Sequence, residues 1–163
     1  MHNFYQIKEW IEAGRECPVA EKHGEVHQID VRKDYLPFLL KYKEDWSGLK
    51  IAMDVSNGMA SLFVHEIFGD EPAYIYDNMD GTFPNHEPNP LVPKNVVDLQ
   101  KLVAATKADI GIIFDGDADR VMFVDENSRF ISPDLMIAVL GHYFLEERGE
   151  KGYIHQDIRS SKA

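Results

Sequence analysis

The sequence predicts an α/β protein, a three-layer α/β/α sandwich with a mixed, largely parallel sheet. Apolar residues make up 44% of the 163 residues, which is enough for a core. From Trp46 onward, short strand-like segments alternate with helix-like segments. One of these segments, 109–114, is almost continuously apolar, as is typical of a strand that is buried on both faces of a parallel sheet.

The first 45 residues contain few apolar residues for their length and are predicted to form a connector. A helix is expected over 4–14, because apolar residues recur there at helical spacing. A weak alternation predicts a short strand over 26–31. A second helix is expected over 34–42, with Pro37 tolerated in its first turn.

The next segments predict the first strands of the sheet and two helices. Apolar residues alternate over 49–55, which predicts a strand, and a helix is expected after it to about Phe68. A second strand over 73–76 precedes a long loop, 77–92, and loops of this length are often functional. Pro93 then opens a helix. The inner face of that helix is predicted to comprise Val92, Val96, Leu99, Val103 and Thr106.

The remaining sequence predicts further strands over 109–114, 121–124 and 129–131. Ser132 is expected to cap the helix that follows, with Pro133 in its first position. That helix is expected to end at Gly149 and to turn five apolar residues inward. They are Leu135, Val139, Leu140, Tyr143 and Phe144. Residues 153–158 are predicted to begin another strand.

Charge and composition exclude several classes of partner. The net charge is −11, with 17 Lys plus Arg against 28 Asp plus Glu, which argues against nucleic acid. Cys17 is the only cysteine, so no internal disulfide is possible and a reducing compartment is expected. No apolar run approaches the roughly 20 residues of a membrane helix. The N-terminus lacks the features of a signal peptide, so a cytoplasmic location without a membrane partner is expected.

Three carboxylates, Asp115, Asp117 and Asp119, alternate in a loop that leaves the predicted strand 109–114. In an open α/β sheet, ligands collect at the carboxyl ends of the strands. Three like charges this close repel one another, so an unoccupied site is expected to raise their pKa values, and a divalent cation removes the conflict. Oxygen ligands favour Mg²⁺ or Ca²⁺ over Zn²⁺.

Three other interpretations of this loop remain. They are a solvated acidic turn, an EF-hand loop, and the Asp-x-Asp motif of a haloacid-dehalogenase-type phosphatase, which works directly through an aspartate. In an EF-hand, Glu126 would fall at the twelfth position, but Arg120 occupies the sixth position, where glycine is needed. In the dehalogenase motif, Thr or Val is expected where this chain has Asp119.

The motif Asp-Gly-Asp-Ala-Asp-Arg at 115–120 resembles the metal-binding loop of the alpha-D-phosphohexomutases, the phosphomannomutase/phosphoglucomutase family. Asp-Val-Ser-Asn-Gly-Met-Ala at 54–60 resembles the first strand, turn and helix of that family's second domain. His-Glu-Pro-Asn-Pro-Leu at 86–91 resembles the loop before that domain's second helix. Asp-Ile-Arg-Ser-Ser at 157–161 resembles the start of the third domain. The four matches occur in the family's order and cover 46–163.

The resemblance implies a parent enzyme that interconverts sugar 1-phosphate and 6-phosphate through a phosphoserine and a bisphosphate intermediate, with Mg²⁺ as cofactor. It implies that Asp115, Asp117 and Asp119 are the metal ligands. For Arg120 two roles stay open: it binds the phosphoryl group, or it pairs with a neighbouring carboxylate. The implied partners are a phosphosugar substrate and the other domains of the parent chain.

The implied domain organisation is a connector over 1–45, the metal-binding second domain over 46–148, and the start of a third domain over 149–163. The chain contains no stretch like the family's Thr-Ala-Ser-His-Asn-Pro serine loop, so this fragment alone is expected to be inactive. The sugar-selecting loop is absent too, so the hexose is not predicted. Apolar residues near the two ends predict self-association. The alternative functions are a free-standing metal-binding or regulatory module and an aspartyl-dependent phosphatase.

Overall fold

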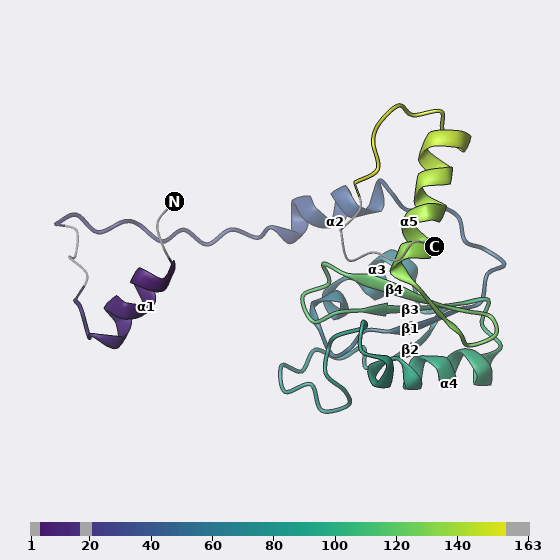
Figure 1. Cartoon of the computed structure of the whole chain (residues 1–163), viewed down its shortest axis with the longest axis horizontal. Helices are drawn as coiled ribbons and strands as arrows, with labels where there is room; N and C mark the ends of the chain where they lie inside the picture. The colour runs from purple at the N-terminus through teal and green to yellow at the C-terminus, as the bar shows by residue number, and fades with distance from the viewer. Residues whose placement is uncertain (1–3, 17–20, 156–163) are drawn as a thin grey trace. The chain divides into compact units, whose positions relative to one another are not determined.

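In the computed structural model the chain divides into two compact units, Met1–Lys33 and Asp34–Ala163 (Figure 1). The structure describes residues 4–16 and 21–155. Among these residues, no helix is both long enough and apolar enough to cross a membrane.

The first unit contains the helix α1, Phe4–Glu12, which confirms the helix predicted there. The strand predicted over 26–31 is wrong, because these residues form neither a helix nor a strand. Val26 and Ile29 are 94% and 80% exposed. A strand needs a neighbour to bond its backbone groups, and no strand pairs with this segment.

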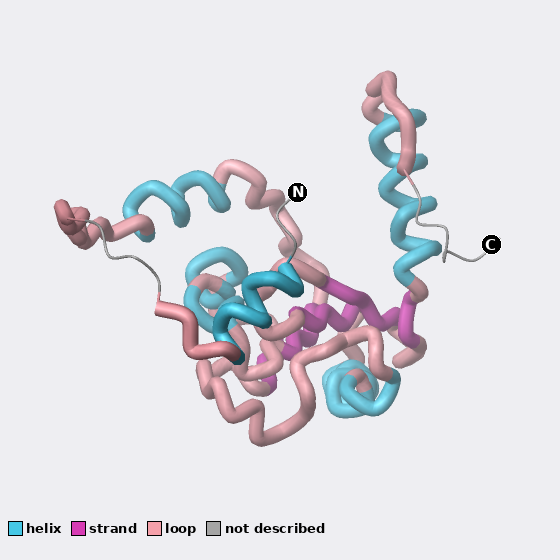
Figure 2. Tube along the Cα trace, turned by 60° about the vertical axis from the view of Figure 1, so that its left-hand side comes forward, coloured by secondary structure: helices cyan, strands magenta, loops and turns pink. Residues whose placement is uncertain are grey.

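The second unit is built on a five-stranded mixed sheet in the order β2-β1-β3-β4-β5. β1, Ile51–Asp54, lies between two parallel neighbours, β2, Ala73–Ile75, and β3, Ile110–Phe114. β4, Val121–Asp125, pairs antiparallel with β3, and β5, Phe130–Ile131, pairs antiparallel with β4. Figure 2 shows these strands as one continuous layer. The predicted mixed sheet is therefore confirmed.

One face of the sheet is covered by α4, Val97–Thr106, which follows the short 3₁₀ turn η2, Pro93–Asn95. The predicted inner face of this helix is confirmed at its centre and wrong at Thr106, which is exposed. The core on this side is fully or almost fully buried. It comprises Ala52, Val96, Leu99, Val103, Ala108, Ile113 and Val124.

A second apolar cluster lies under the short elements that follow β1, and it makes the third layer. The single helix predicted to reach Phe68 is divided into a 3₁₀ turn, η1, Met59–Leu62, and a helix, α3, Val64–Phe68. The division falls at Phe63, whose N–H donates to the carbonyl of Ala60 at 3.0 Å instead of continuing an α-helical pattern. The cluster contains Val55, Ala60 and Val64, with Phe68, Tyr74 and Phe114 packed against them.

The helix α2, Arg32–Leu40, begins two residues earlier than predicted. Pro37 therefore lies inside the helix and not in its first turn. Farther along α2, the Tyr35 ring packs edge-on against Phe63 of the second cluster, with 5.4 Å between the ring centroids.

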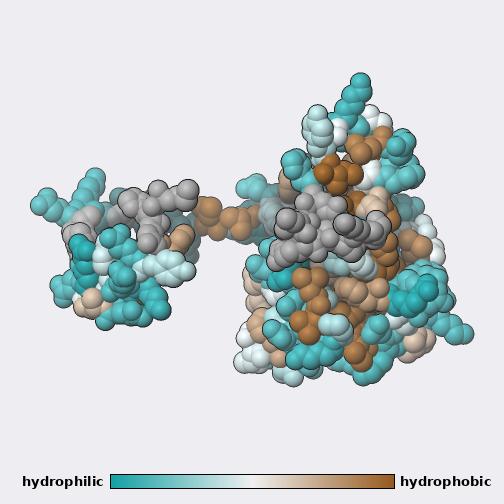
Figure 3. All heavy atoms as spheres, viewed as in Figure 1, coloured by the Kyte–Doolittle hydropathy of each residue, from teal (hydrophilic) through white to brown (hydrophobic). Residues whose placement is uncertain are grey.

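The last helix, α5, Pro133–His142, continues into a π-helical turn, η3, Tyr143–Glu147. Its predicted cap is confirmed, since the Ser132 hydroxyl accepts from the Asp134 N–H at 3.3 Å. Its predicted inward face is wrong, because all five apolar residues are at least 40% exposed. The helix starts at the edge strand β5 and leads away from the sheet, and Figure 3 shows apolar side chains at the surface there. The five residues are Leu135, Val139, Leu140, Tyr143 and Phe144.

After Gly149 the chain returns along α5. Ile154 lies so close to Gly141 that a β-carbon on the glycine would be 2.5 Å from the Ile154 side chain. The strand predicted over 153–158 is absent from 153–155, and 156–158 lie outside the described residues.

β3 was predicted to be buried on both faces, and it is buried on one. Gly111 and Ile113 face α4 and are buried, whereas Ile110, Ile112 and Phe114 on the other face are partly exposed. The reason is that α4 covers its face of the sheet closely, while the short η1 and α3 cover only part of the other face.

The close approach of α4 to β3 predicts that Gly111→Ala destabilises the protein. The new β-carbon would lie 2.7 Å from Val103 Cγ2 and 3.2 Å from Leu99 Cδ1. Overpacking of this kind typically lowers the free energy of unfolding by about 1–3 kcal/mol. Urea denaturation measures the loss.

The matched control is Gly81→Ala, because nothing lies within 4 Å of that position. It should change the free energy of unfolding by less than about 0.5 kcal/mol. If the two variants are equally stable, α4 does not pack against β3 as closely as described.

Candidate metal site

The three predicted carboxylates come together in the loop after β3, residues 115–120, called the aspartate loop below. Asp115, Asp117 and Asp119 each offer an oxygen, and these oxygens lie within 4.8 Å of one another. Asp115 is fully buried, whereas the other two are exposed. Among residues 4–16 and 21–155, this is the one group of three or more His, Cys, Asp or Glu side chains close enough to hold an ion.

Hydrogen bonds within the aspartate loop bring these carboxylates together. The Asp115 N–H donates to the Arg120 carbonyl at 3.1 Å, and the Ala118 N–H donates to the Asp115 carbonyl at 3.3 Å. The Arg120 N–H donates to Asp115 Oδ1 at 3.1 Å. Ala118 has a φ of 63°, a left-handed conformation that a small residue adopts more easily than a bulky one. The loop therefore returns on itself, which places its three carboxylates close together.

Arg120 pairs with a carboxylate of its own loop. Its Nε donates to Asp115 Oδ2 at 2.6 Å and lies 3.5 Å from Asp119 Oδ1. The arginine side chain is 45% exposed, so part of the guanidinium faces solvent. Of the two roles predicted for Arg120, the structure contains the pairing with a neighbouring carboxylate. Its role in phosphate binding stays a prediction.

The pKa values in the aspartate loop shift in opposite directions. Burial by itself would raise the pKa of Asp115, but the backbone and side-chain N–H groups of Arg120 and a hydrogen bond with Asp119 hold that pKa below its ordinary value. The shared hydrogen bond with Asp115 and repulsion from Asp117 raise the pKa of Asp119. The predicted rise is thus correct for Asp119 and wrong for Asp115, because Arg120 compensates the buried charge.

The turn that follows β1, residues 55–59, lies directly against the aspartate loop and is called the β1 turn below. The Ser56 hydroxyl donates to the Phe114 carbonyl at 2.6 Å, and the Met59 N–H donates to the Gly116 carbonyl at 2.9 Å. A β-carbon at Gly58 would lie 2.7 Å from the Gly116 oxygen. Only glycine fits at this position without displacing the aspartate loop.

A third segment, the proline loop 77–92, completes the surroundings of the site. Asn57 of the β1 turn donates to the Asn78 carbonyl at 2.8 Å and accepts from the Asn85 side chain at 2.8 Å. On the other side, a β-carbon at Gly116 would lie 3.3 Å from Pro88 and 3.5 Å from Phe83. Loops from the ends of β1, β2 and β3 therefore meet at this edge of the sheet.

A buried ion pair lies at the same edge. Asp54, the last residue of β1, is fully buried, and its Oδ2 lies 3.0 Å from His86 Nε2 of the proline loop. The His86 side chain is 8% exposed. None of Asp54, Asn57 and His86 was predicted to be a site residue. The available signal was that Asp54 and Asn57 lie in the segment 54–60 and that His86 opens the segment 86–91, and both segments were singled out for their resemblance to a known family.

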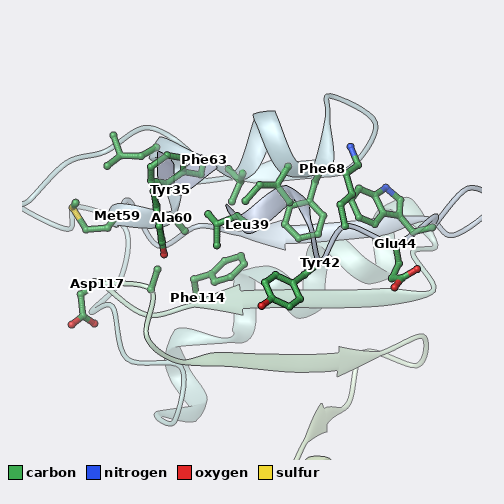
Figure 4. Close-up of a pocket in the computed structure, with 16 residues that line it drawn as sticks. Tyr35, Leu39, Tyr42, Glu44, Met59, Ala60, Phe63, Phe68, Phe114 and Asp117 are labelled. Carbon is green, nitrogen blue, oxygen red and sulfur yellow. The ribbon is translucent and has the colours of Figure 1, made fainter. Parts of the chain in front are cut away.

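A large apolar groove, with a cavity volume of about 690 Å³, opens beside the aspartate loop. Figure 4 shows Phe63 and Phe68 along it, Phe114 from the sheet, and Asp117 at one end. Its walls are mainly aromatic and aliphatic, so the groove itself offers little to a phosphate. The polar edge made by the three loops is the better candidate for the functional site.

A family model described as phosphoglucomutase/phosphomannomutase, alpha/beta/alpha domain II, matches residues 33–128. The chain belongs to this family. The family resemblance inferred from the sequence motifs is confirmed, and so is the α/β/α architecture. The sequence motif of the aspartate loop lies inside the matched region.

Several members of the family are similar over most of the chain. A phosphoglucomutase of Neisseria meningitidis serogroup A is 34% identical over 149 residues, which cover 88% of this chain and 32% of the relative. A probable phosphoglucosamine mutase of Methanopyrus kandleri is 36% identical over 150 residues, which cover 88% of this chain and 33% of the relative. The chain therefore spans about a third of the length of these relatives.

A solved structure agrees with the sequence relatives. A phosphoglucomutase/phosphomannomutase family protein from Burkholderia thailandensis is similar with a TM-score of 0.71 and 30% identity. The match covers 87% of this chain and 31% of that protein. The relatives are named phosphoglucomutase and phosphoglucosamine mutase, and the part of this chain that the family model matches is described as their alpha/beta/alpha domain II.

The burial of Asp115 predicts that Arg120→Gln destabilises the protein. Without the guanidinium, a fully buried carboxylate keeps the backbone N–H of residue 120 but loses its charged partner. The free energy of unfolding should fall by about 2 kcal/mol, as is typical when a buried charged group loses a hydrogen bond. Chemical denaturation at neutral pH measures it.

Arg129→Gln is the matched control, because Arg129 pairs with Asp125 at 2.7 Å in the same way. Its carboxylate partner is 18% exposed and keeps some contact with water, so the expected loss is below about 1 kcal/mol. Equal losses in the two variants would mean that the burial of Asp115 does not depend on Arg120.

Proposed function

We propose that residues 46–148 are the metal-binding second domain of a phosphohexomutase, with Asp115, Asp117 and Asp119 as the metal ligands. The parent enzyme would interconvert sugar 1-phosphate and sugar 6-phosphate through a phosphoserine and a bisphosphate intermediate. The observation that carries the proposal is the convergence of three carboxylates in the aspartate loop of a chain that belongs to this family.

The donor set fits a hard divalent cation, and Mg²⁺ is the ion that we propose. All three side chains offer only oxygen, and their oxygens are close enough for one ion. Although Asp115 already accepts twice from Arg120, a carboxylate has about four lone-pair sites and can also face an ion. A bound Mg²⁺ would neutralise phosphate charge during transfer.

Arg120 is proposed as a phosphate-binding residue as well as the partner of Asp115. Its Nε faces Asp115, and the rest of its side chain is partly exposed beside the two outer carboxylates. Five donors in a planar fork allow one arginine to hold a carboxylate on one side and a phosphate oxygen on the other.

The domain organisation is part of the proposal. Residues 1–45 would be the connector from a first domain and 149–163 the start of a third. The exposed apolar face of α5 supports contact with other domains of the parent chain or, in this chain by itself, self-association. By itself the chain is proposed to be inactive, because no serine loop of the family's type occurs in its sequence. A cytoplasmic location and a phosphosugar substrate belong to the parent enzyme.

The metal site predicts weak Mg²⁺ binding that depends on Asp117. Mg²⁺ prefers six well-placed oxygens and keeps its waters, and three carboxylates provide only part of such a site. Asp117→Asn should weaken the affinity for Mg²⁺ by roughly tenfold or more. Losses of this size in metal affinity are typical when residues around a metal site are replaced. Isothermal titration calorimetry measures the affinity.

Glu126→Gln is the control, because Glu126 is an exposed carboxylate in the neighbouring turn and would be a ligand only in an EF-hand. The Mg²⁺ affinity of the Glu126→Gln variant should equal that of the wild-type chain. Tight binding that Asp117→Asn leaves unchanged would place the metal elsewhere and overturn the proposed site.

A further inference from the structure

The buried pair of Asp54 and His86 has no part in the metal-ligand set, although it lies one strand away from it. Asp54 ends β1, and β1 pairs in parallel with β3, so that Asp54 is in register with Ile113, two residues before Asp115. An ion pair that is almost completely buried costs desolvation energy and is weak evidence for stability by itself. Its position at the edge where three loops meet suggests a more specific role.

Both ring nitrogens of His86 have an oxygen partner, and this arrangement suits the protonated ring. Its Nδ1 lies 2.9 Å from the Glu87 carbonyl, which can only accept, so Nδ1 carries a proton. Its Nε2 lies 3.0 Å from the Asp54 carboxylate, which accepts when it is ionised. When Asp54 is ionised and His86 is protonated, both ring nitrogens donate, and an imidazolium cation faces a buried carboxylate.

The surroundings of His86 favour the cation. The hydrogen bond to Asp54 raises the pKa of His86, burial opposes the rise, and the Glu87 carbonyl and the charge of Asp98 add to it. Tyr76 packs edge-on against the imidazole ring, with 5.4 Å between centroids, and its hydroxyl donates to Asp98 at 2.9 Å. Asp98 in turn pairs with Lys101 at 2.8 Å.

A chain of three hydrogen bonds connects His86 to Phe114, the residue of β3 that directly precedes the aspartate loop. His86 donates to Asp54 Oδ2, and Asp54 Oδ1 accepts from the Ser56 N–H at 2.9 Å. The Ser56 hydroxyl then donates to the carbonyl of Phe114 at 2.6 Å, one residue before Asp115. Ser56 has a φ of 54°, a left-handed conformation that needs support from its neighbours.

His86 also holds the proline loop against the same site. Its neighbour Asn85 bonds Asn57, and Phe83 and Pro88 lie against Gly116 of the aspartate loop. One ion pair thus fixes the β1 turn through Asp54 and the proline loop through His86. Both segments contact the backbone of the aspartate loop.

We propose that Asp54 and His86 are a positioning pair, which holds the β1 turn and the proline loop in the arrangement that brings the three carboxylates of the aspartate loop together. The inference rests on the proposed function in one respect, because the activity served by this arrangement is metal binding. Neither residue belongs to the proposed ligand set, and both would act through the backbone of residues 114–116.

The pair gives metal binding a distinctive pH dependence. Carboxylate sites normally gain affinity as the pH rises and protons leave the ligands. Here the folded-state pKa of His86 is raised, so its stabilising contribution is complete below the unfolded pKa of about 6.5 and is lost as the pH rises through the folded value. Mg²⁺ affinity should therefore rise with pH and then fall above the pKa of His86.

The test compares His86→Gln with the matched control His65→Gln. His65 also bonds two aspartates, Asp70 at 3.0 Å and Asp77 at 2.9 Å, and its pKa is also raised, but its side chain is 41% exposed. Two quantities are measured in each variant. They are the Mg²⁺ affinity across the pH range and the protection of the Ala118 and Arg120 amides against hydrogen exchange.

His86→Gln should weaken Mg²⁺ binding by roughly tenfold to a hundredfold, as expected for groups that orient metal ligands. It should also abolish the fall in affinity at high pH and expose both amides to faster exchange. His65→Gln should change all three much less, because its side chain is 41% exposed and its partner Asp77 lies at the start of the proline loop, away from Phe83 and Pro88 in the sequence. If His86→Gln binds Mg²⁺ like the wild-type chain and protects the two amides equally, the positioning role is wrong while the metal site stands.

Two further outcomes are decided by the same experiment. If the wild-type chain does not bind Mg²⁺, the proposed function fails, and amide exchange alone still decides whether His86 holds the aspartate loop. If His86→Gln does not fold, the wild-type chain supplies the answer. Amide protection in the aspartate loop that stays constant while His86 titrates, followed by NMR, would overturn the proposal.

Discussion

The structure of the site depends on one buried carboxylate, Asp115, at the end of β3. A buried charge is costly unless it is paired and hydrogen-bonded, and here Arg120 supplies both its backbone N–H and its guanidinium. To reach Asp115, the chain must return on itself within five residues. That return brings Asp117 and Asp119 close to Asp115, so the pairing that makes burial possible also assembles the candidate metal ligands.

The same constraint extends to the neighbouring strand ends. Because Asp115 is buried, the loops around it must cover it and still satisfy their own backbone groups. The β1 turn does so through Ser56 and Met59, and Gly58 permits the close contact with Gly116. A second buried acid, Asp54, has His86 of the proline loop as its partner, with 3.0 Å between Oδ2 and Nε2. The edge of the sheet is therefore organised by two buried acids, each with a basic partner.

Features that depend on local sequence were predicted well, and features that depend on distant partners were not. The cap at Ser132, the central positions of α4 and the three clustered aspartates follow from short patterns. The strand over 26–31 and the inward face of α5 were wrong, because an apolar pattern does not specify what covers it. The pair of Asp54 and His86 was missed because 32 residues separate its members: each opens a segment that resembles the family, but neither segment indicates that the two side chains meet.

The central claim is that the three carboxylates of the aspartate loop hold one divalent cation. The most direct test replaces Mg²⁺ with paramagnetic Mn²⁺ and follows the line broadening of backbone amides by NMR. The account predicts that broadening begins at residues 115–120 and spreads next to Met59, whose N–H bonds the carbonyl of Gly116. Broadening centred on the turn 125–128, or spread over the acidic surface without a centre, would contradict the claim.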